Sequence, residues 1–180
     1  MNSSDVKTRD SCRYRLAKTQ DLPALHALQA ESYPPAMQEN EAVILQRLQQ
    51  APATCWIAED EAGACAYLFA YPSLLGAVTP LEGGFAVAAD ANTLYLHDLA
   101  VSRRVAGRGV GRWLFNLAME FALARRMPYS ALVSVQDSCR YWMKLGYELS
   151  APAPEYRDCL QGYPEEARYM VKSLNHLSLY

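Results

Sequence analysis

The sequence lacks the features that would place the protein in a membrane or on nucleic acid. No hydrophobic run approaches the roughly 20 residues that span a bilayer, and the polar start MNSSDVKTRDS has no apolar core of a signal peptide. The formal net charge is only −2, so the overall charge attracts neither nucleic acid nor an anionic membrane. We therefore expect a cytoplasmic protein that binds neither.

The cysteines and histidines also lack the spacing of a disulfide framework or a metal site. The five cysteines include no C-x-x-C pair, and the three histidines are scattered along the chain. This pattern gives neither a disulfide framework nor a zinc site. We expect reduced thiols and no metal.

What remains is the composition of an ordinary globular domain, with 51% hydrophobic and 20% charged residues in 180. We expect a loose tail over 1–12 and a single domain over 13–180. Hydrophobic periodicity predicts a mixed α/β sheet with helices packed on it. The expected strands are 14–17, 54–59, 64–71, 93–101, 129–135, 147–149 and 167–174. One expected helix begins after Asp21, which caps it. The other expected helices cover 39–50, 110–126 and 138–145. Residues 72–92 form a long connection of the kind that is usually functional.

The segment VSRRVAGRGVGR, residues 101–112, has glycine at 107, 109 and 111 between a strand and an amphipathic helix. Glycines let backbone N–H groups approach an anion, and a helix N-terminus favours negative charge. Arg108 and Arg112 can add charge-assisted hydrogen bonds to a phosphate. A dinucleotide-binding G-x-G-x-x-G pattern fails because Arg112 stands where its third glycine belongs, and no P-loop is present.

The longer segment LHDLAVSRRVAGRGVGRWL resembles the acetyl-CoA signature of the GNAT superfamily of N-acetyltransferases, with Ala106 in place of the usual Arg or Gln. A second segment, YWMKLGYE, resembles that family's F-Y-x-K-L-G motif. The resemblance implies a mostly antiparallel sheet with two splayed strands, 93–101 and 129–135, and helices on both faces. It implies acetyl-CoA as co-substrate and no metal. The residues it implies for the cofactor are Leu99, Ala100, Val101, Gly107, Arg108, Gly109, Val110, Gly111, Arg112, Ser138 and Trp142.

A narrower resemblance concerns catalysis. LYLHDLAV is similar to the H-L-H-A-L-A-V strand of arylalkylamine N-acetyltransferases, which implies His97 as the base that deprotonates the amine and Tyr95 as its neighbour. The alternative for His97 is a hydrogen-bonded core histidine. Strand periodicity predicts that Tyr95, His97, Leu99 and Val101 share one face, with Asp98 on the other unless a bulge redirects it.

The leaving thiolate lacks an obvious proton donor, because Trp142 stands where the family usually has tyrosine. Tyr141, Tyr147 and Cys139 are the replacement candidates, and transfer without an acid is the alternative. We expect Glu31, Tyr33 and Tyr71 to contact the acceptor.

The resemblance thus predicts acetyl transfer to a small primary amine by direct attack in a ternary complex. The alternatives are a protein lysine or N-terminal acetyltransferase, an acyl-CoA-binding module without catalysis, and a nucleotide-binding domain. Because members of the family are often dimers, we also expect a possible homodimer.

Overall fold

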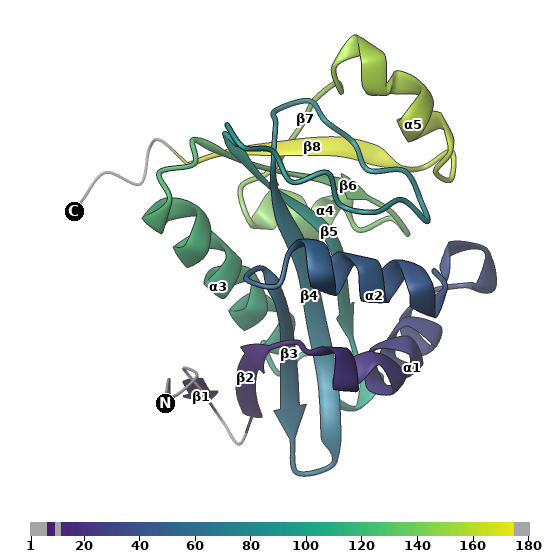
Figure 1. Cartoon of the computed structure of the whole chain (residues 1–180), viewed down its shortest axis with the longest axis vertical. Coiled ribbons are helices and arrows are strands. Elements are labelled where there is room, and N and C mark those ends of the chain that lie inside the picture. The colour runs from purple at the N-terminus through teal and green to yellow at the C-terminus, as the bar shows by residue number, and fades with distance from the viewer. Residues whose placement is uncertain (1–6, 10–11, 175–180) are drawn as a thin grey trace.

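The computed structural model describes residues 7–9 and 12–174, which are built around one eight-stranded sheet (Figure 1). The strand order is β1-β2-β3-β4-β5-β6-β8-β7, and every neighbouring pair is antiparallel except β5 and β6. This mostly antiparallel mixed sheet confirms the expected fold class. The strands are β1 (Lys7–Arg9), β2 (Cys12–Leu16), β3 (Cys55–Asp60), β4 (Gly63–Ser73), β5 (Thr93–Val101), β6 (Tyr129–Ser134), β7 (Glu148–Leu149) and β8 (Arg168–Ser173).

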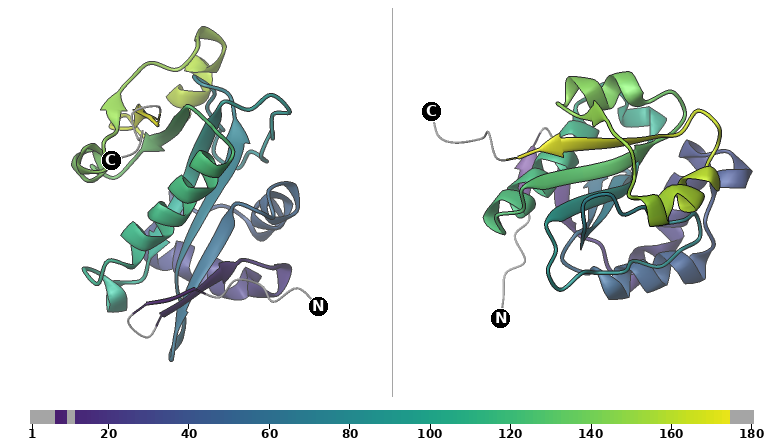
Figure 2. Two further views of the ribbon diagram at one scale, coloured as in Figure 1. Left: turned by 90° about the vertical axis from the view of Figure 1, so that its left-hand side faces the viewer. Right: turned by 90° about the horizontal axis from the view of Figure 1, so that it is seen from above.

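The helices cover both faces of this sheet. In the described part of the chain they are α1 (Leu22–Ser32), α2 (Glu41–Gln50), α3 (Val110–Ala124), α4 (Cys139–Lys144) and α5 (Arg157–Gln161). Figure 2 shows in its left view that α3 and α2 lie on opposite sides of the strands. Because both faces are covered, the central strands are buried on both sides, and β4 is almost fully apolar.

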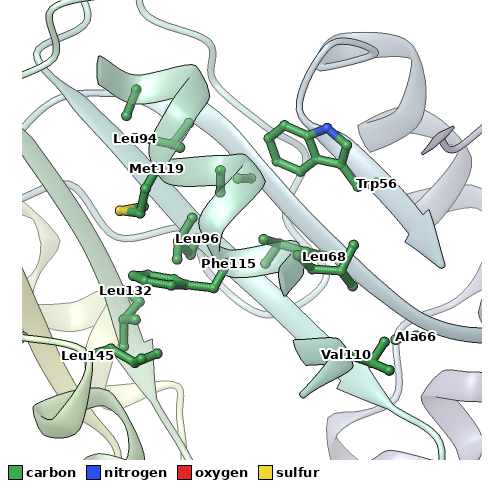
Figure 3. Packing of buried hydrophobic residues seen from close by; sticks show 14 of the residues in the cluster. Trp56, Ala66, Leu68, Leu94, Leu96, Val110, Phe115, Met119, Leu132 and Leu145 are labelled. Atoms are coloured by element: carbon green, nitrogen blue, oxygen red, sulfur yellow. The ribbon is translucent and has the colours of Figure 1, made fainter. Parts of the chain in front are cut away.

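Each face has its own hydrophobic core. On one face, α3 packs Leu114, Phe115 and Ala118 against side chains from β4, β5 and β6, as Figure 3 shows around Phe115. On the other face, α1 and α2 pack Leu25 and Ile44 against the same strands. The period-2 alternation of β-strand side chains therefore decides which core each residue enters.

Local sequence signals explain most helix ends. α1 stops just before the Pro34–Pro35 pair, and Asn40 caps α2 by accepting a hydrogen bond from Val43 N at 3.0 Å. Gly146 follows α4 with a φ of 86°, the left-handed conformation expected of a glycine there.

Asp21 precedes α1, but it does not cap that helix with its side chain. Its carboxylate accepts hydrogen bonds from Lys18 N at 2.7 Å and from the Arg15 guanidinium at 2.7 and 2.8 Å. The predicted cap is therefore wrong in its mechanism. The carboxylate closes the preceding turn and ties it to β2 instead.

Three further segments differ from expectation or extend it. Lys7–Arg9 pairs with β2, so part of the predicted loose tail belongs to the sheet; residues 1–6 and 10–11 lie outside the described residues. The expected loop after β7 contains α5, which is too short for a periodic signal. The connection 74–92 has neither helix nor strand, and its Phe85 is 3% exposed because it enters the core of α1 and α2.

We predict that truncating a core side chain of α3 destabilises the protein much more than truncating a surface one. Leu114→Ala removes a side chain with 0% exposure and should lower the free energy of unfolding by about 2–5 kcal/mol. Leu123→Ala on the same helix, where the leucine is 40% exposed, should cost less than about 1 kcal/mol. Urea denaturation of both variants checks this, and equal losses would contradict the packing described.

Candidate active site

β5 and β6 run side by side and then diverge. Their parallel register begins at Thr93↔Tyr129 and ends at Leu96↔Leu132, although both strands continue beyond that point. A cleft of 640 Å³ opens where they separate. The expected splay is therefore present, and beyond Leu96 the backbone of β5 has no ladder partner on β6.

The glycine loop forms one wall of the cleft. Gly107 and Gly109 have φ angles of 77° and 79°, and an added Cβ at either would meet no atom within 4 Å. Backbone conformation, and not lack of space, therefore favours glycine at these two positions. Gly111 differs, because a Cβ there would lie 3.1 Å from the side chain of Val101. The first two glycines shape the loop, and the third lets α3 approach β5 closely.

The first turn of α3 presents backbone donors to the cleft. Its N–H groups have no acceptor within the helix, no side chain caps them, and Val110, Gly111 and Arg112 all line the cleft. The positive end of the helix macrodipole lies at the same place. This wall is suited to a pyrophosphate.

Most of the expected cofactor residues line this cleft, but two do not. Ala100 is fully buried in the core of α1 and α2, because alternation turns it away from Leu99 and Val101. Arg108 lies between two glycines of left-handed conformation; it is exposed and does not line the cleft. The arginines that line the cleft are Arg103 and Arg112. The residues that do line it are Leu99, Val101, Gly107, Gly109, Val110, Gly111, Arg112, Ser138 and Trp142.

A β-bulge lies at the point where β5 leaves β6. Phe69 of β4 pairs with Asp98, but the next residue, Ala70, pairs with Leu96, so His97 is an extra residue on β5. The bulge shifts the alternation by one residue. As a result His97 and Asp98 both lie on the face of α1 and α2.

The predicted common face of four β5 residues is therefore wrong. Leu99 and Val101 pack with the core of α3, whereas Tyr95 belongs to the opposite core. Tyr95 is 1% exposed, does not line the cleft, and contacts His97 with ring centroids 6.3 Å apart. It is a packing neighbour of His97, so the structure removes it from the set that can touch a substrate in the cleft.

His97 is buried and held by a carboxylate. Its side chain is 4% exposed, and its Nε2 lies 3.3 Å from Glu39 Oε1. Burial, and next the charge of Arg47, lower the pKa of His97, which favours the neutral ring. Because a carboxylate only accepts, Nε2 carries the proton and Nδ1 has the lone pair. Nδ1 is buried without a hydrogen-bond partner among the described residues.

Glu39 is the residue that sequence analysis missed here. Burial alone would raise the pKa of its carboxyl, but hydrogen bonds from His97 and Arg47, together with the charge of Arg47, outweigh burial and lower the pKa to about 2. The Arg47 guanidinium, with 0% exposure, donates to both oxygens of Glu39. Arg47 also donates to Gly83 O at 2.8 and 3.0 Å, and Glu82 N donates to Glu39 at 3.1 Å. The ion pair thus joins α2, the 74–92 connection and β5.

Asp98, the next residue after His97, is a second carboxylate of the site, and it is half-buried. Tyr33 Oη donates to its Oδ1 at 2.5 Å, and Tyr67 Oη donates to its Oδ2. Burial raises the pKa of Asp98 against the effect of these two hydrogen bonds. Asp98 lines the cleft and also an adjoining recess of 30 Å³ that His97 shares.

The three expected acceptor residues have different positions. Tyr33 lines both the cleft and the recess. Glu31 lines the cleft, but its Oε1 accepts from Arg103 N at 2.7 Å and from Ser102 Oγ at 3.2 Å, so it anchors the segment before the glycine loop. Tyr71 lines neither the cleft nor the recess. It stacks on Phe85 and lines a separate cavity of 180 Å³.

The side chains of α4 close the far end of the cleft. Trp142 is 8% exposed, and its indole N–H donates to Ser138 Oγ at 3.2 Å. Of the three candidate acids, only Tyr141 lines the cleft. Tyr147 is 1% exposed and bonded to Ser130, and Cys139 lies outside the lining. Burial raises the pKa of Tyr141 while the charge of Arg112 opposes the shift, so its hydroxyl stays protonated at neutral pH.

The comparison with known families agrees with this geometry. The profile described as the acetyltransferase (GNAT) family matches residues 22–147, most of the chain. The chain belongs to this family. GNAT proteins are acyltransferases that use acetyl-CoA, and the cleft between β5, β6, α3 and α4 supplies the backbone donors that this ligand requires.

Solved structures of low sequence identity share the fold. The GNAT-like decarboxylase GphF, determined with isobutyryl-CoA, is 20% identical with a TM-score of 0.70, covering 89% of this chain and 98% of its own. The loading GNATL domain of CurA from Lyngbya majuscula is 14% identical with a TM-score of 0.73, covering 92% and 98%. The NatC complex, determined with Gag peptide and CoA, is 15% identical with a TM-score of 0.67, covering 91% and 99%. No curated protein matches significantly.

The described residues contain neither a candidate metal site nor a candidate membrane span. No group of three or more His, Cys, Asp or Glu is arranged to hold a metal ion in residues 7–9 and 12–174. Within the same residues, every helix is too short or too polar to span a bilayer.

We predict that breaking the buried ion pair from one side is costly. Arg47→Met leaves the Glu39 carboxylate buried without its cation and should lower the free energy of unfolding by about 3–5 kcal/mol. The double variant Glu39→Leu, Arg47→Met should recover much of this loss, since it removes both charges. Arg157→Met, at an exposed arginine, is the control and should be nearly neutral. Urea denaturation measures all three, and a near-neutral Arg47→Met would contradict the argument.

The lowered pKa of Glu39 predicts a pH dependence of stability. Its carboxyl has a pKa of about 2 in the folded state against an ordinary value of 4.5, so its contribution is complete above pH 5 and is lost as the pH falls towards 2. The loss should amount to about 3 kcal/mol. Unfolding free energies measured from pH 7 to 2 should fall more steeply for the wild type than for Glu39→Gln; parallel curves would show that this carboxylate is not the cause.

Proposed function

We propose that the protein transfers the acetyl group of acetyl-CoA to a small primary amine, with His97 as the base. One observation carries the proposal: Nδ1 of His97 is buried without a hydrogen-bond partner among the described residues, and His97 lines both the cleft and the recess. A buried acceptor without a partner is unfavourable, and a proton donor on a bound substrate would satisfy it. The Glu39 carboxylate orients the ring for this role.

The reaction proceeds by direct attack in a ternary complex. The amine reaches the site as an ammonium and loses a proton to His97 Nδ1, and its nitrogen lone pair then attacks the thioester carbonyl. The nitrogen of the tetrahedral intermediate loses its second proton to solvent, and the intermediate collapses by breaking the C–S bond, so that the amide forms and the CoA thiolate leaves. The Tyr141 hydroxyl lines the same cleft, and it is the group we propose to protonate the sulfur. His97 returns its proton to solvent.

The shape of the acceptor side favours a small substrate. The recess next to His97 measures 30 Å³, and Leu81 from the 74–92 connection forms part of its wall. This connection is anchored by Gly83 on Arg47 and by the buried ring of Phe85. An anchored wall of this kind keeps the recess narrow, which favours a small acceptor over a peptide chain. The NatC complex, whose structure holds a Gag peptide, represents the alternative of a protein acceptor.

The test is thiol release from acetyl-CoA with a panel of small primary amines and short peptides. Turnover on small amines should exceed turnover on peptides, and His97→Ala should lower kcat by roughly 10²–10⁴-fold. His26→Ala is the matched control, because His26 is exposed on α1 and should be silent.

Other outcomes point to other functions. Peptides acetylated faster than small amines would favour a protein acetyltransferase. CoA binding with no thiol release from any acceptor would favour a binding module. Loss of CO₂ from a carboxyacyl-CoA, without amine acetylation, would favour the chemistry named for GphF. Activity that survives in His97→Ala would remove the proposed base.

A further inference from the structure

The charges buried around His97 do not balance. Glu39 is neutralised by Arg47, through hydrogen bonds to both carboxylate oxygens. Asp98 has no ion pair with any lysine, arginine or histidine within the described residues, although it is surrounded by protein. With His97 neutral, an ionised Asp98 is a carboxylate that no cationic side chain of the described residues pairs with. A buried charge without a cation is costly, so such a site favours a bound cation.

The hydrogen-bond partners of Asp98 favour its ionised form against the effect of burial, and Asp98 lines the cleft. Tyr33 and Tyr67 each donate a hydroxyl hydrogen to a different oxygen of the carboxylate. Burial raises the pKa of both tyrosines well above 10, so the two phenols remain donors at neutral pH. Each carboxylate oxygen can accept a further hydrogen bond. Asp98 lines both the cleft and the recess, so a ligand can reach it.

We infer that Asp98 is the counter-ion of the acceptor, and that the protein selects amines that arrive as ammonium ions. The bulge on β5 places Asp98 and His97, whose Nδ1 is unpartnered, on the same face, and both residues line the cleft and the recess. One N–H of the ammonium is donated to Asp98 and another to His97 Nδ1, which then removes the proton. This inference rests on the proposed function and extends it: aliphatic amines of pKa near 10 are substrates, and weakly basic aromatic amines, which are neutral at pH 7, are poor ones.

The test uses binding, so that it does not depend on turnover. Butylguanidinium carries a permanent charge, and butylurea is its neutral counterpart of nearly the same shape. We expect calorimetry on the wild-type protein with CoA to give a Kd for butylguanidinium that is roughly 10- to 100-fold lower than for butylurea. Equal affinities for the two would overturn the inference, even if amines are acetylated.

Variants then locate the charge. Asp98→Asn keeps the size of the side chain and should abolish most of the difference between the two ligands, while raising the KM for a butylamine acceptor by a similar factor and leaving the KM for acetyl-CoA unchanged. Asp90→Asn removes an exposed charge of the same sign and should keep the wild-type preference. A preference that persists in a folded Asp98→Asn would overturn the assignment. If that variant fails to fold, the wild-type comparison alone still decides whether a cation is selected.

The two proposals fail in different ways. If no amine is acetylated but butylguanidinium is preferred, the cation site stands and the acetyl acceptor must be sought elsewhere. If butylamine is acetylated and the charged and neutral ligands bind equally, the transferase stands and Asp98 is a structural carboxylate.

Discussion

The site depends on one interruption of the sheet, where β5 loses its partner β6 and gains an extra residue against β4. Parallel strands that stay paired would leave no opening, because side chains of both would fill the space between the helices. Separation after Leu96↔Leu132 opens the cleft, and the bulge at His97 occurs at the same point. The bulge places two consecutive polar side chains on one face, which a regular strand cannot do. Both the cleft and the recess lie at this local irregularity.

The buried ion pair of Glu39 and Arg47 gives this opening a rigid wall. Burying two charges costs several kcal/mol of desolvation, and their attraction offsets that cost only when the remaining donors and acceptors are satisfied. Here they are, since Arg47 also bonds Gly83 O and Glu39 also accepts from Glu82 N and faces His97. A hydrophobic pair could stabilise the fold as well, but it could not orient an imidazole. The arrangement therefore favours a precise ring position over maximal stability.

The cleft wall and the recess present different chemical groups. On the donor side, the glycine loop and the first turn of α3 offer backbone N–H groups and a positive dipole to a phosphate-bearing ligand. In the recess, the Glu39 carboxylate is paired with Arg47, and the Asp98 carboxylate and the neutral His97 lie with Tyr33 and Tyr163. Under the proposal made above, an anionic co-substrate and a cationic acceptor would approach from regions of opposite charge.

The sequence by itself determined the elements whose signals are local. The strand at 93–101, the glycine loop and the helix behind it follow from residue patterns within a short window. The family resemblance, and with it His97 as the base candidate, rests on the same short segments. Only the tertiary structure decided what surrounds His97. Glu39 lies 58 positions away from it along the chain, and its contact depends on how α2 packs. Which face of the sheet carries the Asp98 side chain depends on the register of β5 against β4. A shift of one residue in that register would turn the side chain to the other face. Tyr71 and Arg108 were misplaced for the same reason: periodicity gives a side chain's direction relative to its neighbours in sequence, while the cavity it enters is set by distant segments.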